Sequence, residues 1–129
     1  MGFKVEIDGI QNLYKAFEAK RKEIAEIIKK DVDEGADKII ATAKEKAPKD
    51  KHNLENAIDK NEVWDKNNKI SVSVGIQIND VFKKADGWYA RMQEKGTSKM
   101  KAHPYLRPAL NKHKKEIHGQ IENDIKRVL

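Results

Sequence analysis

Residues 70–78 read ISVSVGIQI, and this stretch decides the fold. Its apolar members alternate with serine, glycine and glutamine, and they are Ile70, Val72, Val74, Ile76 and Ile78. A period of two is typical of a half-buried β-strand with one apolar and one polar face. Residues 62–64 also predict a strand, and the polar residues 65–69 predict a turn between the two. We therefore expect this strand to pair antiparallel with the strand that contains Val63.

The N-terminal third of the chain predicts one more strand and a long helix. Residues 3–7 alternate apolar and polar side chains and end at Asp8-Gly9. Beyond them, apolar residues recur mainly at spacings of three, four or seven, beginning Ile10, Leu13, Phe17, Ile24, Ile27, Ile28 and Val32. This pattern predicts one amphipathic helix up to about Lys46, where Ala47-Pro48 stops it. Gly35 is its weak point, because glycine costs about 1 kcal/mol against alanine in a helix, and a bend is expected there.

The C-terminal half predicts a second helix. Residues 54–58 fit either a short helical turn or the start of a strand, and residues 88–92 open either a strand or a short helix. Residues 104–129 predict a helix with one apolar face, formed by Leu106, Leu110, Ile117, Ile121, Ile125 and Val128. Pro104 suits the first turn of this helix, and Pro108 marks either its true start or a kink.

The fold class that follows is α+β. We expect an antiparallel sheet of about four strands, packed on one long N-terminal helix, plus a C-terminal helix. The chain of 129 residues is predicted to form a single domain, 1–129. Hydrophobic residues make up 38% and charged residues 37%. This balance fits either a well-solvated helical surface or a subunit whose core is completed by its neighbours.

Positive charge is concentrated at the C-terminal end. Residues 83–129 contain 12 basic and 5 acidic residues, whereas residues 1–82 contain 15 and 16. A basic end is suited to nucleic acid or to an acidic protein surface. Lysine dominates over arginine, which argues against a surface that reads bases. The candidate DNA-facing residues are Lys112, Lys114 and Lys115, which lie off the apolar face of the last helix.

The sequence offers no combination of residues typical of an enzyme. Without cysteine, the chain has no disulfide, no thiolate metal ligand and no thiol nucleophile. His113 and His118 are five residues apart, whereas a metal pair on one helical face needs a spacing of three or four. The carboxylates are scattered among lysines, as on a solvated helix. We therefore predict no catalytic residues, no cofactor and no metal, and no apolar run approaches the ~20 residues of a membrane span.

Residues 88–110, WYARMQEKGTSKMKAHPYLRPAL, predict an ordered contact loop. Glycine and proline fix special backbone angles, while aromatic residues, methionine and arginine are favoured at interfaces. The candidate interface residues are Trp88, Tyr89, Glu94, Gly96, Thr97, Lys99, Met100, Pro104, Tyr105, Arg107 and Pro108. The alternative is that Tyr89, Tyr105 and Leu106 simply complete the core. We expect a bidentate pair between the side chains of Glu94 and Arg107 to hold the loop and to display residues 99–101.

The same segment resembles the head–tail joining, or tail-completion, family of tailed bacteriophages and prophages. Its pattern is Tyr-Ala, Glu-aromatic-Gly-Thr, then Pro-Phe-Leu-Arg-Pro-Ala, and the matching residues are Tyr89, Ala90, Glu94, Gly96, Thr97, Pro104, Leu106, Arg107, Pro108 and Ala109. Lys95 replaces the usual aromatic residue and Tyr105 the usual phenylalanine. The segment from Val5 to Ile10 and Ala47-Pro48 fit the family more weakly, and His52-Asn53-Leu54 stands where Thr-Gly-x-Leu is usual.

This resemblance implies a structural virion-morphogenesis protein. Such a subunit would assemble in the bacterial host cytoplasm and reside at the head–tail junction or tail of the virion. Its partners would be other junction or tail proteins, and it would form a homo-oligomeric ring in the assembled virion. In isolation we expect a monomer or a weakly associated protein, because the modest apolar content leaves little surface for a strong self-interface. The alternative function is a small module that binds nucleic acid independently of sequence.

Overall fold

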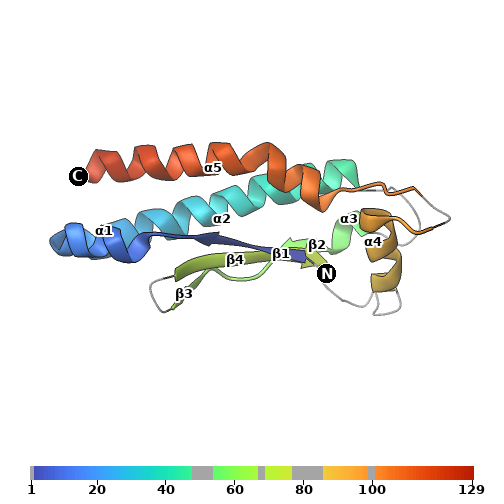
Figure 1. Ribbon diagram of the computed structural model, residues 1–129, viewed down its shortest axis with the longest axis horizontal. Coiled ribbons are helices and arrows are strands. Elements are labelled where there is room, and N and C mark those ends of the chain that lie inside the picture. The colour runs from blue at the N-terminus through green and yellow to red at the C-terminus, as the bar shows by residue number, and fades with distance from the viewer. Residues whose placement is uncertain (1, 48–53, 67–68, 77–85, 99–100) are drawn as a thin grey trace.

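The computed structural model describes residues 2–47, 54–66, 69–76, 86–98 and 101–129. The elements follow the order β1 (Gly2–Ile7), α1 (Ile10–Ala16), a 3-10 helix (Glu18–Lys20), α2 (Arg21–Lys46), α3 (Leu54–Ala57), β2 (Ile58–Lys60), β3 (Trp64–Lys66), β4 (Lys69–Ile76), α4 (Asp86–Lys95) and α5 (Leu106–Val128). The fold is α+β, as predicted. Figure 1 shows three layers, in which α2 lies between the sheet and α5.

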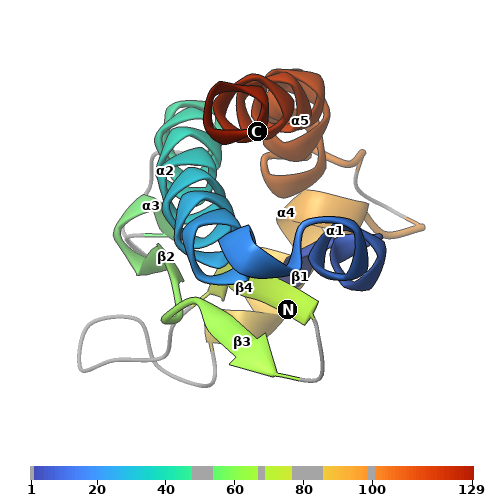
Figure 2. The ribbon, with the colours of Figure 1, turned by 90° about the vertical axis from the view of Figure 1, so that its left-hand side faces the viewer.

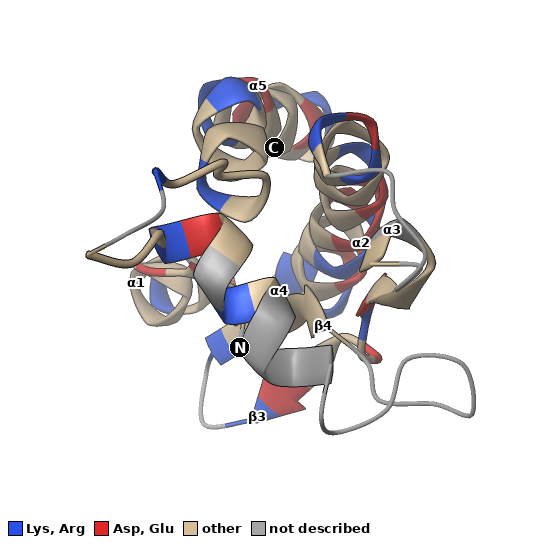
Figure 3. Ribbon diagram, turned by 90° about the vertical axis from the view of Figure 1, so that its right-hand side faces the viewer, with Lys and Arg blue, Asp and Glu red and all other residues tan. Residues whose placement is uncertain are grey.

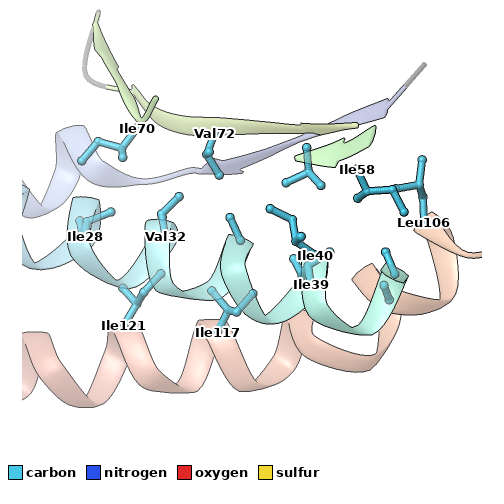
Figure 4. Packing of buried hydrophobic residues seen from close by; sticks show 14 of the residues in the cluster. Ile28, Val32, Ile39, Ile40, Ile58, Ile70, Val72, Leu106, Ile117 and Ile121 are labelled. Carbon is cyan, nitrogen blue, oxygen red and sulfur yellow. The ribbon is translucent and has the colours of Figure 1, made fainter. Parts of the chain in front are cut away.

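The strand β4 is the centre of the four-stranded antiparallel sheet. Along one side it pairs with β1, and along the other it pairs with β2 and then β3. The register places Phe3, Val5 and Ile7 of β1 opposite Val74, Val72 and Ile70 of β4. These apolar side chains share one face of the sheet, and Figure 4 shows Ile70 and Val72 pointing from that face toward α2.

The strand predictions are largely confirmed. β4 agrees with the prediction through Ile76, and residues 77–78 lie outside the described part of the chain. Its predicted antiparallel partner is β3, which begins one residue after Val63 and includes Asp65 and Lys66, two residues expected in the turn. The ambiguous segment 54–58 takes both forms, since α3 leads directly into β2.

The core lies on both sides of α2. Ile28 and Val32 point toward the sheet, while Ile117 and Ile121 of α5 pack against the opposite side of the helix (Figure 4). Each fully buried side chain of this size contributes about 1.5–3 kcal/mol through removal of apolar surface from water. The long helix therefore has apolar residues on two faces, which explains why its apolar positions are so dense.

The prediction of one unbroken helix from Ile10 to Lys46 is wrong at its start. α1 ends at Ala16, and Phe17 has φ −130° and ψ 54°, outside the helical region. A 3-10 turn follows before α2 begins at Arg21. Phe17, which was assigned to the apolar face, is 40% exposed. Between Phe17 and Ile24 the sequence has no large apolar residue, and this gap in the apolar pattern marks the break.

Gly35 is a contact point and does not end or divide α2. It is buried in the middle of that helix, and a Cβ atom there would lie 2.7 Å from both Cδ1 and Cγ1 of Ile117. A methyl group at this distance would overlap the isoleucine. The missing side chain thus lets α5 approach α2 closely, which is a tertiary requirement that the helix pattern alone does not contain.

The last helix begins at Leu106, two residues after the predicted start at Pro104. Pro108 is its third residue and lies in the first turn, where backbone N–H groups have no acceptor within the helix. Pro108 is therefore accommodated without loss of an intrahelical hydrogen bond. Residues 88–92, for which the sequence allowed either a strand or a short helix, lie in the helix α4.

Candidate interface at the α4–α5 junction

The predicted contact loop is a connection between two helices. We call its described part, residues 90–98 and 101–109, the α4–α5 junction. It comprises the last turns of α4, a turn at Gly96 and the first turn of α5. Gly96 has φ 74°, a left-handed conformation that glycine adopts without strain and that commonly ends a helix. Figure 3 looks directly at this end of the molecule, with α4 in front and the start of α5 above it.

The carboxylate of Glu94 caps the N-terminus of α5. Its Oε2 accepts hydrogen bonds from the backbone N–H groups of Tyr105 at 2.6 Å and Leu106 at 3.1 Å. Its Oε1 accepts a third from Arg107 at 2.9 Å. The first N–H groups of a helix have no partner inside it, and negative charge is favoured beside them. Because Tyr105 at the cap position makes no side-chain capping bond itself, Glu94 supplies the cap from another helix.

This geometry corrects the predicted bidentate pair between Glu94 and Arg107. The two residues do meet, but in the described part of the chain the bond comes from the Arg107 backbone. The Arg107 residue is exposed at the surface. Removal of the arginine side chain therefore preserves this bond, whereas removal of the glutamate side chain eliminates three. Glu94 is the residue on which the junction depends.

Tyr105 is the second fixed point of the junction. It is completely buried, and its hydroxyl donates to the backbone carbonyl of Ala90 at 3.0 Å. Burial, and secondarily the charge of Glu94, raise the pKa of this phenol, so it remains a neutral donor at physiological pH. The backbone N–H of His103 adds a bond of 2.7 Å to the carbonyl of Gln93. Tyr105 therefore belongs to the core. This agrees with the alternative prediction from the sequence, in which Tyr105 completes the core and does not form an interface.

Some of the predicted interface residues are exposed in the described part of the junction. Other residues there are exposed although they were not predicted, namely Arg91, Lys95, Ser98, Lys101 and His103. Thr97, Pro104 and Arg107 are exposed, and Pro108 is half-buried. Trp88 and Tyr89 lie on α4, where only their backbone is described. Lys99 and Met100, the predicted tip, lie outside the described residues. We call Thr97, Pro104 and Arg107, the predicted interface residues that are exposed, the exposed ridge. Glu94 and Tyr105 hold the backbone on its α5 side.

Basic residues surround this ridge. Lys112, Lys114 and Lys115 are exposed on α5, on the side that the sequence predicted. The first ten residues of α5 contain Arg107 and these three lysines and no acidic residue. Arg91, Lys95 and Lys101 are also exposed at the same end of the fold. Figure 3 shows the resulting blue segments on α4 and on the first turns of α5.

His113 has a structural contact between the two long helices. Its Nε2 lies 2.6 Å from Oγ1 of Thr42 on α2, and its Nδ1 lies 3.3 Å from Oε2 of Glu116. Glu116 in turn pairs with Lys38 of α2 at 2.6 Å. Within the described ranges, no group of three or more histidine, cysteine or acidic residues is arranged to hold a metal ion.

One buried carboxyl was missed by the sequence reasoning. Asp31 on α2 is 3% exposed, and its Oδ2 has no hydrogen-bond partner. Burial, followed by its bond to Asp124 of α5, raises the pKa of Asp31 to about 7, while the same bond lowers the pKa of Asp124. The Asp31 carboxyl therefore keeps its proton well above the usual pH range of an aspartate, facing Asp124 of the other helix. Its position one residue before Val32, on the apolar face of α2, would have signalled this burial.

Comparison with protein-family models, with curated proteins and with solved structures found no match for this chain. Among the helices of the described ranges, none is both long enough and apolar enough to cross a membrane.

Proposed function

We propose that this protein is a structural subunit of the head–tail connection or tail-completion ring of a tailed bacteriophage or prophage. The observation that carries the proposal is the α4–α5 junction. The residues that resemble the phage family include Ala90, Glu94, Gly96 and residues 104–109, and several of them contact one another directly. Glu94 binds the backbone of residues 105–107, and Ala90 accepts the bond from Tyr105.

This interdependence strengthens the resemblance. A chance match would scatter similar residues over positions with no physical relation. Here the glutamate, the glycine turn and the residues around the start of α5 cooperate to fix one helix against another. The lysine at position 95, where the family has an aromatic residue, is exposed and takes no part in these bonds. Lysine at position 95 therefore leaves the hydrogen bonds of the α4–α5 junction intact.

The proposed role is assembly through the exposed ridge of Thr97, Pro104 and Arg107. A ridge held from behind loses little conformational entropy when it binds, because it is already ordered. Its partners would be neighbouring subunits of the ring and other proteins of the junction or tail. The subunit would assemble in the bacterial host cytoplasm and act at the head–tail junction or tail of the virion, without a catalytic step or a cofactor.

A second candidate function is binding of nucleic acid independently of sequence. The observation that favours it is the acid-free, basic start of α5. Lysine contacts to phosphate are blind to sequence and are weakened by salt. In the proposed ring, the same residues would face the DNA path or an acidic partner.

The test is deletion of the gene in the strain that carries it, followed by induction and electron microscopy of the particles. We expect separate heads and tails, with the joint restored by the wild-type protein. Antibody against the protein should label the joint. Normal joined particles in the deletion strain would refute the proposal. Genes for portal, capsid and tail-tube proteins beside this gene would support it independently.

A Glu94→Ala variant tests the link between the junction and assembly. We expect it to fold and yet to restore few joined particles, because the ridge loses its support. Glu62→Ala is the control, since Glu62 is an exposed glutamate in the connection between β2 and β3 and lies far from the junction in the sequence. If both variants restored joined particles equally well, the α4–α5 junction would not be needed for assembly.

A further inference from the structure

The strand β1 forms a free edge of the sheet. β4 is paired on both of its sides, whereas β1 pairs only with β4. The Ser73 carbonyl accepts a bond from the N–H of Asn61 on the β2 side, so the backbone groups of Ser73 point away from β1. Lys4 is directly opposite Ser73. In an antiparallel pair, opposite residues both point inward or both point outward, so the N–H and C=O of Lys4 point to the free edge.

Glu6 is two residues further along β1 and repeats this orientation. The edge thus presents two donors and two acceptors at the spacing of a strand. Among the described residues, no backbone hydrogen bond outside the sheet uses these four groups. An exposed edge of this kind is a template for an added strand.

An apolar groove runs beside this edge. It lies between β1 and α5, has a volume of about 490 Å³ and is lined by Lys4, Val5, Glu6, Ile7, Leu110, Lys114, Lys115, Ile117 and His118. A second hollow of about 590 Å³ shares Glu6, Ile7 and His118 with it and extends toward the end of α5. Figure 2 views the molecule along its length, with β1 below and α5 above. The groove is therefore long enough for an extended segment.

The rim of the groove is basic. Lys114 and Lys115 are exposed on the α5 wall, and neither forms an ion pair with another described residue. The acidic side chain of the opposite wall, Glu6, lies 3.9 Å from Lys4 and is partly neutralised by it. A partner that places carboxylates beside Lys114 and Lys115 would meet complementary charge.

We propose that the β1 edge and this groove bind an extended, acidic segment of a partner protein. The segment would add to the sheet beside β1 through backbone hydrogen bonds to Lys4 and Glu6. Every second side chain would face α5, because side chains of a strand alternate between the two faces of the sheet. Of these groove-facing side chains, the ones over Val5 and Ile7 would be apolar, and the ones nearer Lys114 and Lys115 would be carboxylates. Affinity from main-chain bonds with specificity from alternate side chains is the usual form of strand addition.

Two other occupants fit less well. Nucleic acid would satisfy the lysines but leave the apolar floor of Val5, Ile7 and Leu110 uncovered. A second copy of this chain, paired through its own β1, would bring both pairs of Lys114 and Lys115 to the same face of the joined sheet. The net charge of +6 on each copy adds to that repulsion. The inference rests on the edge and the groove, and it does not depend on the phage role.

The probe is a blocked peptide of eight residues, Thr-Val-Thr-Glu-Thr-Val-Thr-Glu, titrated into the ¹⁵N-labelled protein. Its valines and glutamates share one face of an extended strand. We expect NMR shift changes in β1 and in the α5 residues of the groove. Exchange of the Lys4 and Glu6 amide hydrogens should slow about tenfold or more at saturation, because these amides become hydrogen-bonded. The same peptide with lysine in place of glutamate should bind at least about tenfold more weakly.

Two variants test the two parts of the site separately. Lys114→Glu with Lys115→Glu should weaken the glutamate peptide about tenfold or more, whereas Lys101→Glu with Lys112→Glu, an equal charge change outside the groove, should alter affinity less than about twofold. Glu6→Pro removes one edge N–H without removing a bond to β4, and an edge strand tolerates proline. It should abolish slowed exchange at Lys4.

The proposal fails if the shifts lie elsewhere, if both peptides bind alike, or if both lysine pairs have the same effect. It also fails if the protein alone forms a dimer by light scattering that Glu6→Pro dissociates, because a second copy would then be the occupant.

Discussion

The two ends of α5 are held by different forces. Along α2, it is fixed by apolar contacts such as those of Ile117 and Ile121, and by the close approach at Gly35. At its N-terminus it is fixed by hydrogen bonds to Glu94 and by the hydroxyl of Tyr105. Apolar packing determines where the helix lies, and the polar cap determines where it starts. The start bears the exposed ridge, so the part tied by polar bonds is the part with a proposed function.

The largest effect is expected from Gly35→Val, which disturbs the packing of α5 against α2. A branched side chain would overlap Ile117, whose atoms lie 2.7 Å from an added Cβ. We expect the free energy of unfolding to fall by about 2–3 kcal/mol, as for overpacked cores. Ile117→Ala in the same chain should recover part of this loss, measured by urea unfolding as a double-mutant cycle.

Gly119→Ala is the matched control for that experiment. Gly119 lies on α5, and a Cβ there meets nothing within 4 Å. We expect this variant to gain about 0.5–1 kcal/mol from helix propensity. Equal effects of substitution at Gly35 and Gly119 would contradict a close approach of the helices.

The buried carboxyl of Asp31 predicts that the stability of the packed contact between α2 and α5 depends on pH. Folding raises the pKa of Asp31 from 3.8 to about 7, so the native state holds a proton that the unfolded chain releases. Its contribution to stability is complete below pH ~4 and is lost as the pH rises through about 7. The lowered pKa of Asp124 acts in the opposite direction, but only below its ordinary range.

Asp31→Asn should remove most of this slope, because asparagine mimics the protonated form. We expect a gain of about 2 kcal/mol at pH 8 and little change at pH 4. Urea unfolding at both pH values measures the difference. Asp37→Asn, an exposed aspartate on the same helix, should leave the slope in place. A slope that survives in Asp31→Asn would place its origin elsewhere.

Glu94→Ala sharpens the comparison at the polar end. It leaves three backbone N–H groups without their acceptor, and we expect a loss of about 1–2 kcal/mol. Amide exchange should accelerate at residues 105–107 and remain slow around Ile117. Arg107→Ala should cost less than about 0.5 kcal/mol, since its bond comes from the backbone. A larger loss from Arg107→Ala would indicate that the side chain of Arg107 also pairs with Glu94.

Tyr105→Phe removes only the bond to the Ala90 carbonyl. We expect a loss of about 1 kcal/mol, with faster exchange confined to the end of α4. The buried ring remains, so the melting transition should stay cooperative. A cost near zero would mean that the buried aromatic ring alone fixes the junction.

The smallest effect on stability is expected from neutralising Lys112, Lys114 and Lys115 together. All three are exposed, so the change should be within about 0.5 kcal/mol per site. Any DNA binding should be weak, sequence-independent and steeply salt-dependent, and it should decrease in this variant. Gel shifts over a salt series measure it. Tight, sequence-selective binding that persists at high salt would contradict this prediction and would count against the phage role.

The amino-acid sequence by itself determined the fold class and most elements. Period-two alternation specifies a half-buried strand, and recurrence at three and four specifies an amphipathic helix, because each side chain must reach one apolar face. These rules placed β1, β4, α2 and α5. The same local patterns, with the glycine and proline signals, also placed the junction within residues 88–110.

Only the tertiary structure decided which atoms meet. The carboxylate that caps α5 belongs to Glu94, eleven positions before Tyr105, the first residue whose N–H it binds. The role of Gly35 depends on Ile117 of another helix. The interaction between Asp31 and Asp124 likewise joins distant segments, and so does the groove beside β1. Periodicity records which face of an element is apolar, but not the partner that covers that face. That choice is made by packing density and by the need to satisfy every buried polar group.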